Sequence, residues 1–522
     1  MTPDLIAFDC GALRGYISQT SGQLRYLRLG HNELLRGIYG SVRLPNWSTV
    51  NPKLSDFKMD KSATGFVCTF TSTHSDPALS FTWNGRLEAV IVKSNEVLIT
   101  YEFEGTAQAD LSTNRLGLCI LHPASLQGTS VELSKSDSSC LTSEFPKNVS
   151  GNPIFEHFSA MYHTVGDFAR VRIEVEGDDF ETEDQRNFGD ASYKTYCHLQ
   201  KKGAPYKVAK GTIVKQKATV YIQFDPLKID KRTAKSHAVA IPMIGTAIKS
   251  EADLATAKAL KLSHVRCKPE LAAAAQKVGM PIELESADGT SPVPLKTSDK
   301  VLVSTWNRDK RTGKHPATYM AAERVLEYVS TKPNFAGWAG ASVEMHPQTH
   351  QFDTETIMES PWVLCDMVTT ARTLGAKDVI LGPLEVAPYD DPRSKTIDGA
   401  LFAIGCIANA AMMEVNSITL MDAETLSNGP AKAILQMIGG GPVTRGAKVW
   451  TFEPEMVVVD TDNFRVVANL SWESSSTHML TNPNGKHHKM FDSGEVLLNG
   501  KVESIAGVPK TVPPRSITVI YR

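Results

Sequence analysis

Residues 1 to about 230 alternate between apolar and polar positions in short runs, for example at 65–71, 86–92 and 169–175. A period of two with turn residues between the runs is typical of antiparallel strands, and we take Asn84 and Gly85 as one such turn. More than 200 residues of this pattern predict a large two-sheet β-sandwich.

From about residue 235 the pattern changes, and apolar strand-like runs alternate with helical periodicity. Helices are predicted at about 251–260, 271–278, 317–330, 354–374, 397–415 and 430–438. About seven strand–helix units fit a (β/α)8-like TIM barrel, either complete or one strand short. An open doubly wound sheet is the alternative, which the lack of a glycine-rich dinucleotide fingerprint disfavours.

Residues from about 449 onward return to short strand-like runs separated by Pro and Gly. The predicted fold class is therefore multidomain α/β plus all-β. The predicted domains are a sandwich at 1–230, a barrel at 235–445 and a small C-terminal β domain at 449–522.

Composition narrows the range of partners. The chain has 522 residues with 55 Lys+Arg and 57 Asp+Glu, a net charge of −2, which argues against nucleic acid or an anionic membrane as a partner. Its eight cysteines are scattered without a CxxC pair, and the first ten residues do not resemble a secretory signal. We expect buried free thiols, a cytoplasmic location, no cofactor and a small-molecule carbohydrate ligand. The oligomeric state stays open, a homo-oligomer included.

Acidic residues follow several of the predicted barrel strands. Active sites of such barrels lie at the carboxyl ends of the strands, so these residues are candidates for acid–base or nucleophilic chemistry. They are Glu283, Glu285, Glu344, Glu385 and Glu424, together with Arg266 after the second strand. A salt bridge at the rim is the structural alternative for any single one of them.

The segment 346–353 contains His346, His350 and Asp353. The spacing of the histidines would suit zinc on a helix, but Pro347 and the preceding strand favour a loop, so we expect no metal. We assign His350 to catalysis and both His346 and Gln348 to substrate binding.

A second polar segment, at 178–197, lies in the predicted sandwich. It mixes acids, bases, amides and aromatic residues, as suits recognition of a polyhydroxylated ligand, although a self-contained salt-bridge loop explains it equally well. The substrate-binding candidates here are Glu181, Asp184, Arg186, Asp190 and Lys194.

The residues 180–197 resemble the hallmark motif of the D-apionate lactonase family. Shorter blocks at 115–123, 264–266, 347–353, 382–384 and 422–425 are similar to other blocks of that family, in the same order. The resemblance implies a β-sandwich joined to a barrel, and hydrolysis of the ring ester of a branched-chain sugar lactone.

One block departs from the family pattern. Where the family has Thr-Glu-Leu-Asn-Arg, this chain has Ser-Thr-Trp-Asn-Arg at 304–308, with Thr305 at the acidic position. If an acid there is essential in the family, this chain has lost it or uses Glu344 instead, and the substrate or the reaction can differ.

Three functions are consistent with these residues. The first is opening of a sugar lactone such as D-apionolactone, with Glu424, Glu344 or His350 as general base and Arg266 and Gln348 as oxyanion donors. The second is glycoside hydrolysis, with Glu424 as nucleophile and Glu344 or Glu285 as acid. The third is a carbohydrate-binding protein without catalysis, which would lack converging carboxylates.

Overall fold

The computed structural model describes residues 4–135, 137, 139–229, 235–347, 353–386, 391–428, 430–438, 448–452, 456–460, 464–471, 475–476, 486–491, 511–512 and 514–521. Contacts divide the chain into two compact units. We call Thr2–Gln185 with Ser192–Thr233 the sandwich unit, and Arg186–Ala191 with Ala234–Arg522 the barrel unit.

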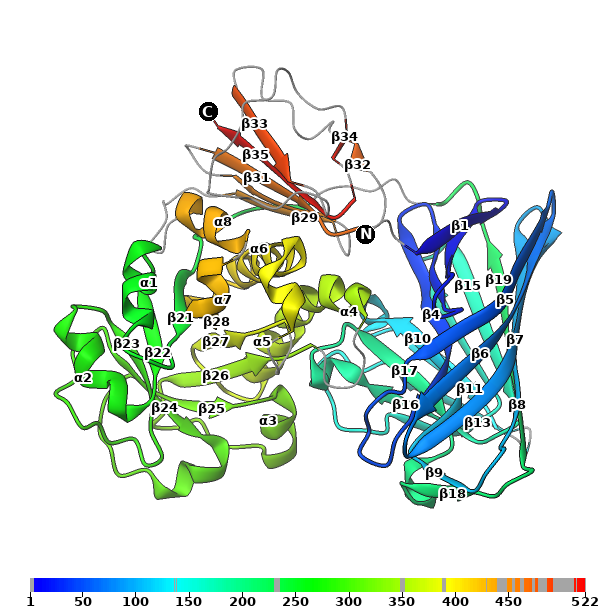
Figure 1. Ribbon diagram of the computed structural model, residues 1–522, viewed down its shortest axis with the longest axis horizontal. Coiled ribbons are helices and arrows are strands. Elements are labelled where there is room, and N and C mark those ends of the chain that lie inside the picture. Colours follow the sequence, from blue (N-terminus) through cyan, green and yellow to red (C-terminus); the bar gives the residue numbers. More distant parts are fainter. Residues whose placement is uncertain are drawn as a thin grey trace. The chain divides into compact units, whose positions relative to one another are not determined.

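The sandwich unit contains two large antiparallel sheets (Figure 1). The eight-stranded sheet has the order β1 (Leu5–Cys10), β2 (Leu13–Ser18), β3 (Leu24–Leu29), β4 (Asn32–Arg43), β10 (Arg115–Pro123), β17 (Ser192–Cys197), β16 (Phe180–Asp184) and β13 (Phe155–Phe158). The nine-stranded sheet has the order β12 (Cys140–Glu144), β11 (Ser130–Ser134), β14 (Ala160–Val165), β15 (Ala169–Glu176), β19 (Ile213–Phe224), β8 (Glu96–Thr106), β7 (Leu79–Lys93), β6 (Gly65–Asp76) and β5 (Pro52–Ser62). A short pair, β9 (Leu111–Thr113) with β18 (Tyr206–Val208), completes the unit.

One continuous apolar core joins the two sheets and includes Leu118 of β10 and Trp83 of β7. Along β7 the buried and accessible side chains alternate, because successive residues of a strand point to opposite faces of the sheet. The predicted sandwich is confirmed. The predicted turn at Asn84 and Gly85 is wrong, since both residues lie inside β7, where Gly85 leaves room for the Phe70 ring.

The central part of the barrel unit is a closed barrel of eight parallel strands. They are β21 (Met243–Ala247), β22 (His264–Cys267), β23 (Ile282–Glu285), β24 (Lys300–Ser304), β25 (Thr318–Ala322), β26 (Gly340–Met345), β27 (Val379–Leu384) and β28 (Ser417–Asp422). The sequence prediction lacks β25, because residues 318–322 fall within the helix predicted at 317–330. That segment is a strand followed by the short helix α3 (Val325–Thr331).

The other predicted helices occur close to their expected positions. They are α1 (Asp253–Ala259), α2 (Pro269–Lys277), α4 (Thr354–Glu359) with α5 (Val363–Thr373), α6 (Ile397–Met412), and α8 (Ala431–Ile438) after the short α7 (Ala423–Asn428). Pro361 lies in the short 3-10 turn Ser360–Trp362 that separates α4 from α5, since proline does not fit the interior of a continuous helix.

A C-terminal sheet packs against α6 within the barrel unit. Its order is β20 (Lys235–Ala238), β29 (Lys448–Phe452), β30 (Met456–Asp460), β31 (Phe464–Asn469), β35 (Ser516–Tyr521) and β33 (Lys486–Phe491), with β32 (Ser475–Ser476) and β34 (Thr511–Val512) as a separate pair. Residues 235–238 therefore pair with the C-terminal sheet, although the sequence prediction starts the barrel domain at 235. An ion pair between Arg515 and Asp398 of α6 also links the sheet to the barrel helices.

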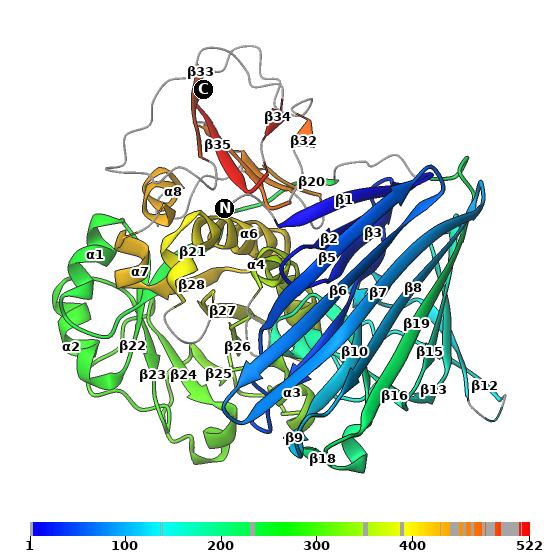
Figure 2. The ribbon, with the colours of Figure 1, turned by 45° about the vertical axis from the view of Figure 1, so that its right-hand side comes forward.

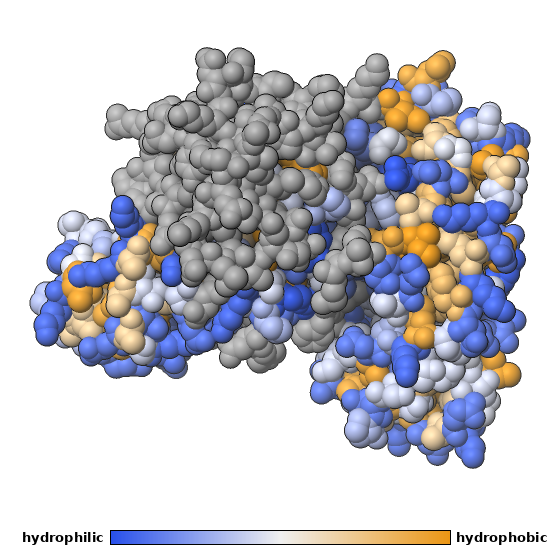
Figure 3. Space-filling view, turned by 45° about the horizontal axis from the view of Figure 1, so that its top comes forward, coloured by the Kyte–Doolittle hydropathy of each residue, from blue (hydrophilic) through white to orange (hydrophobic). Residues whose placement is uncertain are grey.

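The coloured face in Figure 3 is mostly hydrophilic, with apolar residues in small patches. Among the described residues, no helix is long and apolar enough to cross a membrane. All eight cysteines are free thiols, and most of them are buried.

Candidate active site

Arg266, near the carboxyl end of β22, is the centre of a polar cluster at the barrel mouth. Its Nε donates to Glu285 Oε1 at 2.8 Å, and its Nη2 donates to Glu344 Oε1 at 2.5 Å. Only 4 % of the Arg266 side chain is exposed, whereas Glu285 and Glu344 are 40 % and 18 % exposed. Because parallel barrel strands end at the same rim, residues of β22, β23 and β26 meet here.

The third nitrogen of the Arg266 guanidinium, Nη1, donates a hydrogen bond to the carbonyl oxygen of Gly382 on β27. The glycine has φ of +133°, and an added Cβ would lie 2.4 Å from the carbonyl oxygen of Thr419. Only glycine fits this position without moving the backbone.

His346 directly follows β26 and lies between two carboxylates. Its Nε2 is 3.5 Å from Glu344 Oε2, and its Nδ1 is 3.5 Å from Glu385 Oε2. Burial disfavours the charged ring, but the close contacts and charges of Glu344 and Glu385 outweigh burial and raise the pKa of His346 to about 9. The imidazole is therefore a cation at neutral pH.

At Glu344 the charged partners also outweigh burial, but they shift the pKa downward. Burial raises the pKa of its carboxyl, but Arg266 and His346 outweigh burial and lower that pKa below its ordinary value. Glu344 therefore stays ionised and can hold both cations in place.

A second charged layer fills the barrel interior closer to the amino ends of the strands. Glu283 accepts from Lys300 Nζ at 3.0 Å and from the hydroxyls of Ser417 and Thr419 at 2.8 Å each. His264 Nε2 lies 3.3 Å from Glu283, and burial lowers the pKa of this histidine to about 4. With both side chains under 5 % exposed, this layer supports the barrel interior.

Thr305 follows β24 at the position where the family pattern has an acid. Its hydroxyl is buried and donates to the carbonyl oxygen of Ala321 at 2.8 Å. The acids at the mouth come from β23, β26 and the end of β27 instead.

Glu424, the first catalytic candidate, lies elsewhere. It belongs to the first turn of α7, with 72 % of its side chain exposed and an ion pair of 3.0 Å to Lys395. Within the described chain, the partners of Arg266 and Glu344 do not include Glu424. The expectation that Glu424 shares a site with Glu344 receives no support from this arrangement.

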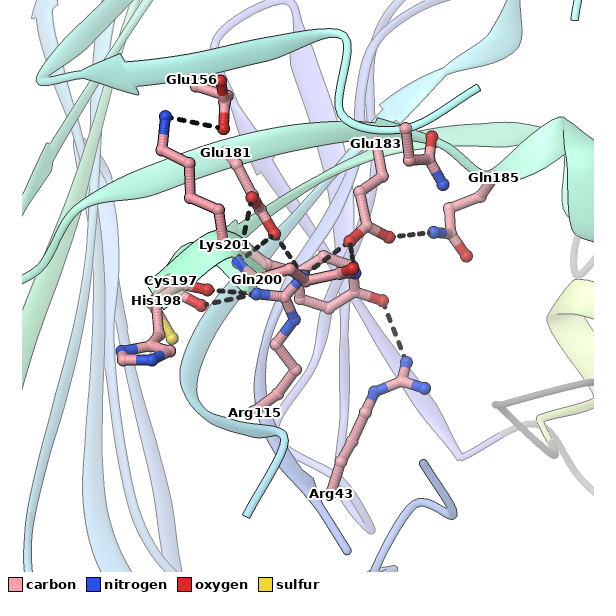
Figure 4. A network of polar contacts seen from close by, with 12 residues as sticks. Arg43, Arg115, Glu156, Glu181, Glu183, Gln185, Cys197, His198, Gln200 and Lys201 are labelled. Carbon is pink, nitrogen blue, oxygen red and sulfur yellow. Dashed lines mark hydrogen bonds and ion pairs between the residues drawn. The ribbon is translucent and has the colours of Figure 1, made fainter. Parts of the chain in front are cut away.

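Glu181, Glu183 and Cys197 of the polar motif at 180–197 belong to a network of polar contacts around Arg115 (Figure 4). Glu181 and Glu183 on β16 each accept from Arg115 Nη2 at 2.6 Å, while Arg115 Nη1 donates to the carbonyls of Cys197 and His198. Gln200 completes the network with its backbone and side-chain amides on Glu181 and Glu183. This is the self-contained salt-bridge arrangement, and it favours a structural role for Glu181.

Two other candidates from the motif are buried in the folded chain. Asp184 is buried and accepts from the backbone N–H of Ser150 at 3.0 Å. Lys194, on β17, is 2 % exposed. Neither residue faces solvent, where a sugar would have to reach it.

The centre of the motif, Arg186–Ala191, belongs to the barrel unit. Arg186 is fully buried and pairs with Asp366 of α5 at 3.1 Å, and the Phe188 ring lies 5.0 Å from the guanidinium of Arg324, which follows β25. Asp190 is 6 % exposed. The motif therefore supplies packing to the barrel rim.

His350 and Gln348 lie outside the described residues. Asp353 caps α4 by accepting from the backbone N–H of Thr356 at 2.7 Å. In the described ranges no three His, Cys, Asp or Glu side chains come together as a set of metal ligands.

Residues 3–225 match the family model of the D-apionate lactonase N-terminal domain. Residues 3–225 are therefore similar to the N-terminal domain of D-apionate lactonases. This confirms the predicted resemblance for the first part of the chain.

A D-apionate lactonase of Brucella anthropi is 30 % identical over 189 residues. This alignment spans 36 % of the present chain and 30 % of the relative, so the chain matches less than a third of the relative's length.

Solved structures are more distant. A glycoside hydrolase family 97 enzyme of Pseudoalteromonas sp. strain K8, in complex with panose, has 8 % identity and a TM-score of 0.30, covering 99 % of both chains. A 4-O-α-L-rhamnosyl-β-D-glucuronidase of Fusarium oxysporum has 8 % identity and a TM-score of 0.36, covering 56 % of this chain and 99 % of the other. A putative aldose 1-epimerase of Escherichia coli K12 has 9 % identity and a TM-score of 0.29, covering 42 % and 99 %. TM-scores this low support no inference about this chain.

Glu385 is among the predicted acids at strand ends, without a predicted role. Its signal is the apolar run 379–384 immediately before it, which makes it the first residue beyond β27. The sequence spacing does not predict that Glu385 and Glu344 lie on either side of His346.

Proposed function

We propose that this chain is a carbohydrate-acting hydrolase that opens a sugar lactone such as D-apionolactone. The observation that carries the proposal is the imidazolium of His346 held between Glu344 and Glu385 at the barrel mouth. The family match of the sandwich unit supports a lactone as the substrate class.

Glu385 is the general base. Its side chain is about a quarter exposed and therefore accessible to water, and its Oε2 contacts His346. Glu344 is a weaker base because its pKa is lowered and both its oxygens face cations. Glu385 removes a proton from water as the oxygen of that water attacks the lactone carbonyl, which is worth a factor of ~10²–10⁴ in rate.

His346 supplies the opposite charge. Its cationic ring stabilises the developing oxyanion and then gives a proton to the ring oxygen as the ester C–O bond breaks. The proton on Glu385 returns to His346 across their 3.5 Å contact, which restores both groups, and the product acid ionises in solvent. Arg266 and Glu344 are positioning residues that hold His346 and the rim carboxylates.

Glycoside hydrolysis is the second candidate. Glu344 on β26 and Glu385 just after β27 both contact His346, so two carboxylates converge at the barrel mouth, and glycosidases use such a pair as acid and base. The same convergence argues against a protein that only binds carbohydrate.

The test distinguishes hydrolysis of a lactone ester bond from hydrolysis of a glycosidic bond. The purified chain is given a panel of aldonolactones and of aryl glycosides, and acid release is followed independently of aglycone release. We expect acid release from a lactone and no aglycone. Turnover of aryl glycosides alone would replace the proposal by the glycosidase, and activity on neither panel would refute both.

A further inference from the structure

A groove of about 770 Å³ lies on the outer face of the nine-stranded sheet, within the sandwich unit. Its strands β5, β6, β7, β8, β19 and β15 lie side by side in Figure 2. It is lined by Asp56, Lys58, Thr69, Phe70, Thr71, Asn84, Gly85, Arg86, Glu102, Phe103, Glu104, Glu176, Gly177, Lys215, Gln216 and Lys217. We call this set the groove.

The polar residues of the groove form two rows that cross the strands. Residues paired directly across neighbouring strands point to the same face of a sheet. The register gives a long row, Lys58, Thr69, Arg86, Glu102, Lys217 and Glu176, and a shorter row, Thr71, Asn84, Glu104 and Lys215. Five strand spacings of about 4.8 Å make the long row about 24 Å long.

The charges in the groove balance. Its four acids are Asp56, Glu102, Glu104 and Glu176, and its four bases are Lys58, Arg86, Lys215 and Lys217. A polyanion would need an excess of bases, so the groove suits a neutral ligand with many donors and acceptors.

The ion pairs in the groove are easily exchanged. Lys215 lies 2.7 Å from Glu104, and Lys217 lies 3.6 Å from Glu176, with both acids more than half exposed. Exposed pairs of this kind contribute at most about 1 kcal/mol each. Hydroxyl groups of a ligand can therefore replace them at little cost.

The backbone beneath the groove is held in place by the sandwich core and by neighbouring strands. Phe70 and Phe103 are buried in the sandwich core, and β6, β7, β8 and β19 each have a strand on both sides. A preformed polar surface binds with little loss of conformational entropy on the protein side.

We propose that the groove binds a neutral oligosaccharide chain of several rings, along the long row. The repeat of a sugar chain is similar in length to the strand spacing, so successive rings can meet successive rungs of donors and acceptors. The site lies in the sandwich unit and is independent of the chemistry proposed for the barrel mouth.

The test uses the full chain, with calorimetric titration of cellohexaose, xylohexaose and, as the charged comparator, hexagalacturonate. N84R inserts a long side chain in the middle of the groove. T82R is its matched control, because Thr82 is exposed on the same face of β7 and does not line the groove. We expect binding of a neutral hexasaccharide that N84R weakens at least about tenfold, the equivalent of 1.4 kcal/mol, and that T82R leaves unchanged.

Unchanged melting temperature and unchanged lactone turnover in both variants show that the fold and the barrel chemistry are intact. No binding of either neutral hexasaccharide, equal binding by N84R and T82R, or preference for hexagalacturonate would each overturn the proposal. None of these outcomes bears on the lactonase, whose failure would appear as loss of acid release in the unaltered chain.

Discussion

Two clusters in this chain share one design, an arginine between two glutamates, and differ in access to solvent. Arg115 joins Glu181 and Glu183 in the sandwich unit, where all three side chains are at most 6 % exposed. Arg266 joins Glu285 and Glu344 in the barrel unit, where the arginine is buried and the acids are not. The first cluster is closed by amides and carbonyls of its own unit, whereas the second opens towards His346 and Glu385.

The two clusters also differ in whether burial or charged neighbours determine the pKa of a glutamate. Burial dominates at Glu183 and raises the pKa of its carboxyl despite Arg115. At Glu344 the cations Arg266 and His346 dominate, and they lower the pKa. Loss of one partner from the closed cluster would leave a buried charge without compensation, whereas the open cluster with a second cation has charge available for chemistry.

The largest effect is expected from E385Q at the open cluster. The amide cannot accept a proton from water, so kcat/KM for lactone opening should fall by ~10²–10⁴, with the melting temperature nearly unchanged. Steady-state kinetics and thermal unfolding measure the two quantities. Turnover within tenfold of the unaltered chain would remove Glu385 from the role of base.

At the closed cluster, R115M should act on stability instead. Removing the arginine leaves Glu181 and Glu183 buried without their cation, and this costs about 3–5 kcal/mol in the free energy of unfolding. Urea unfolding of the full chain measures it. R172M is the control, since Arg172 is 54 % exposed in its pair with Glu174 and should cost under about 1 kcal/mol. Equal losses in both variants would contradict the comparison.

A third distinction concerns pH. The pKa of His346 is raised to about 9 in the folded protein, so its cation is present at neutral pH and is lost as the pH rises through 9. We expect kcat/KM to fall above pH 9 with release of one proton. The stability that His346 contributes should be complete below about pH 6.5 and vanish over the same upper range.

The matching variant is H346Q. It should show lower activity and no inflection near pH 9 in the pH profile of kcat/KM. An inflection that persists in H346Q belongs to another group.

The smallest effect is expected from E424Q, which removes one exposed acid outside both clusters. Because the Glu424 side chain is 72 % exposed and its ion pair is with Lys395, itself 43 % exposed, we expect kcat/KM to change by less than about threefold and stability by under about 1 kcal/mol. The same kinetic assay measures it beside E385Q. A loss as large as that of E385Q would return Glu424 to the catalytic group.

The architecture was largely predictable because period-two and helical patterns are local. Alternation along strands such as β7 identified the sandwich, and strand–helix repeats identified the barrel. The strand β25 was missed because its sequence, Thr-Tyr-Met-Ala-Ala, contains residues that favour helices, and only pairing with β24 and β26 makes it a strand.

The sites were less predictable because their contacts are far apart in sequence. Arg115 and Glu181 are 66 positions apart, and Arg266 and Glu344 are 78 apart, so no spacing rule joins them. A mixed polar segment such as 180–197 indicates a network, but only the packing of the sheets decides whether that network faces solvent or the interior.

The register of β26 and β27 shifts between Val343 and Met345, and that of β27 and β28 shifts between Leu381 and Leu384. Gly382 lies within the second irregularity, and Glu344 lies within the first. The geometry of the proposed site therefore depends on departures from an ideal barrel as well as on the identity of its acidic residues. Placing the same glutamates, histidine and arginine on a perfectly regular barrel would reproduce the residue types but not the orientations of their side chains. An engineer who wished to move this chemistry would have to carry the two kinked strand segments along with it.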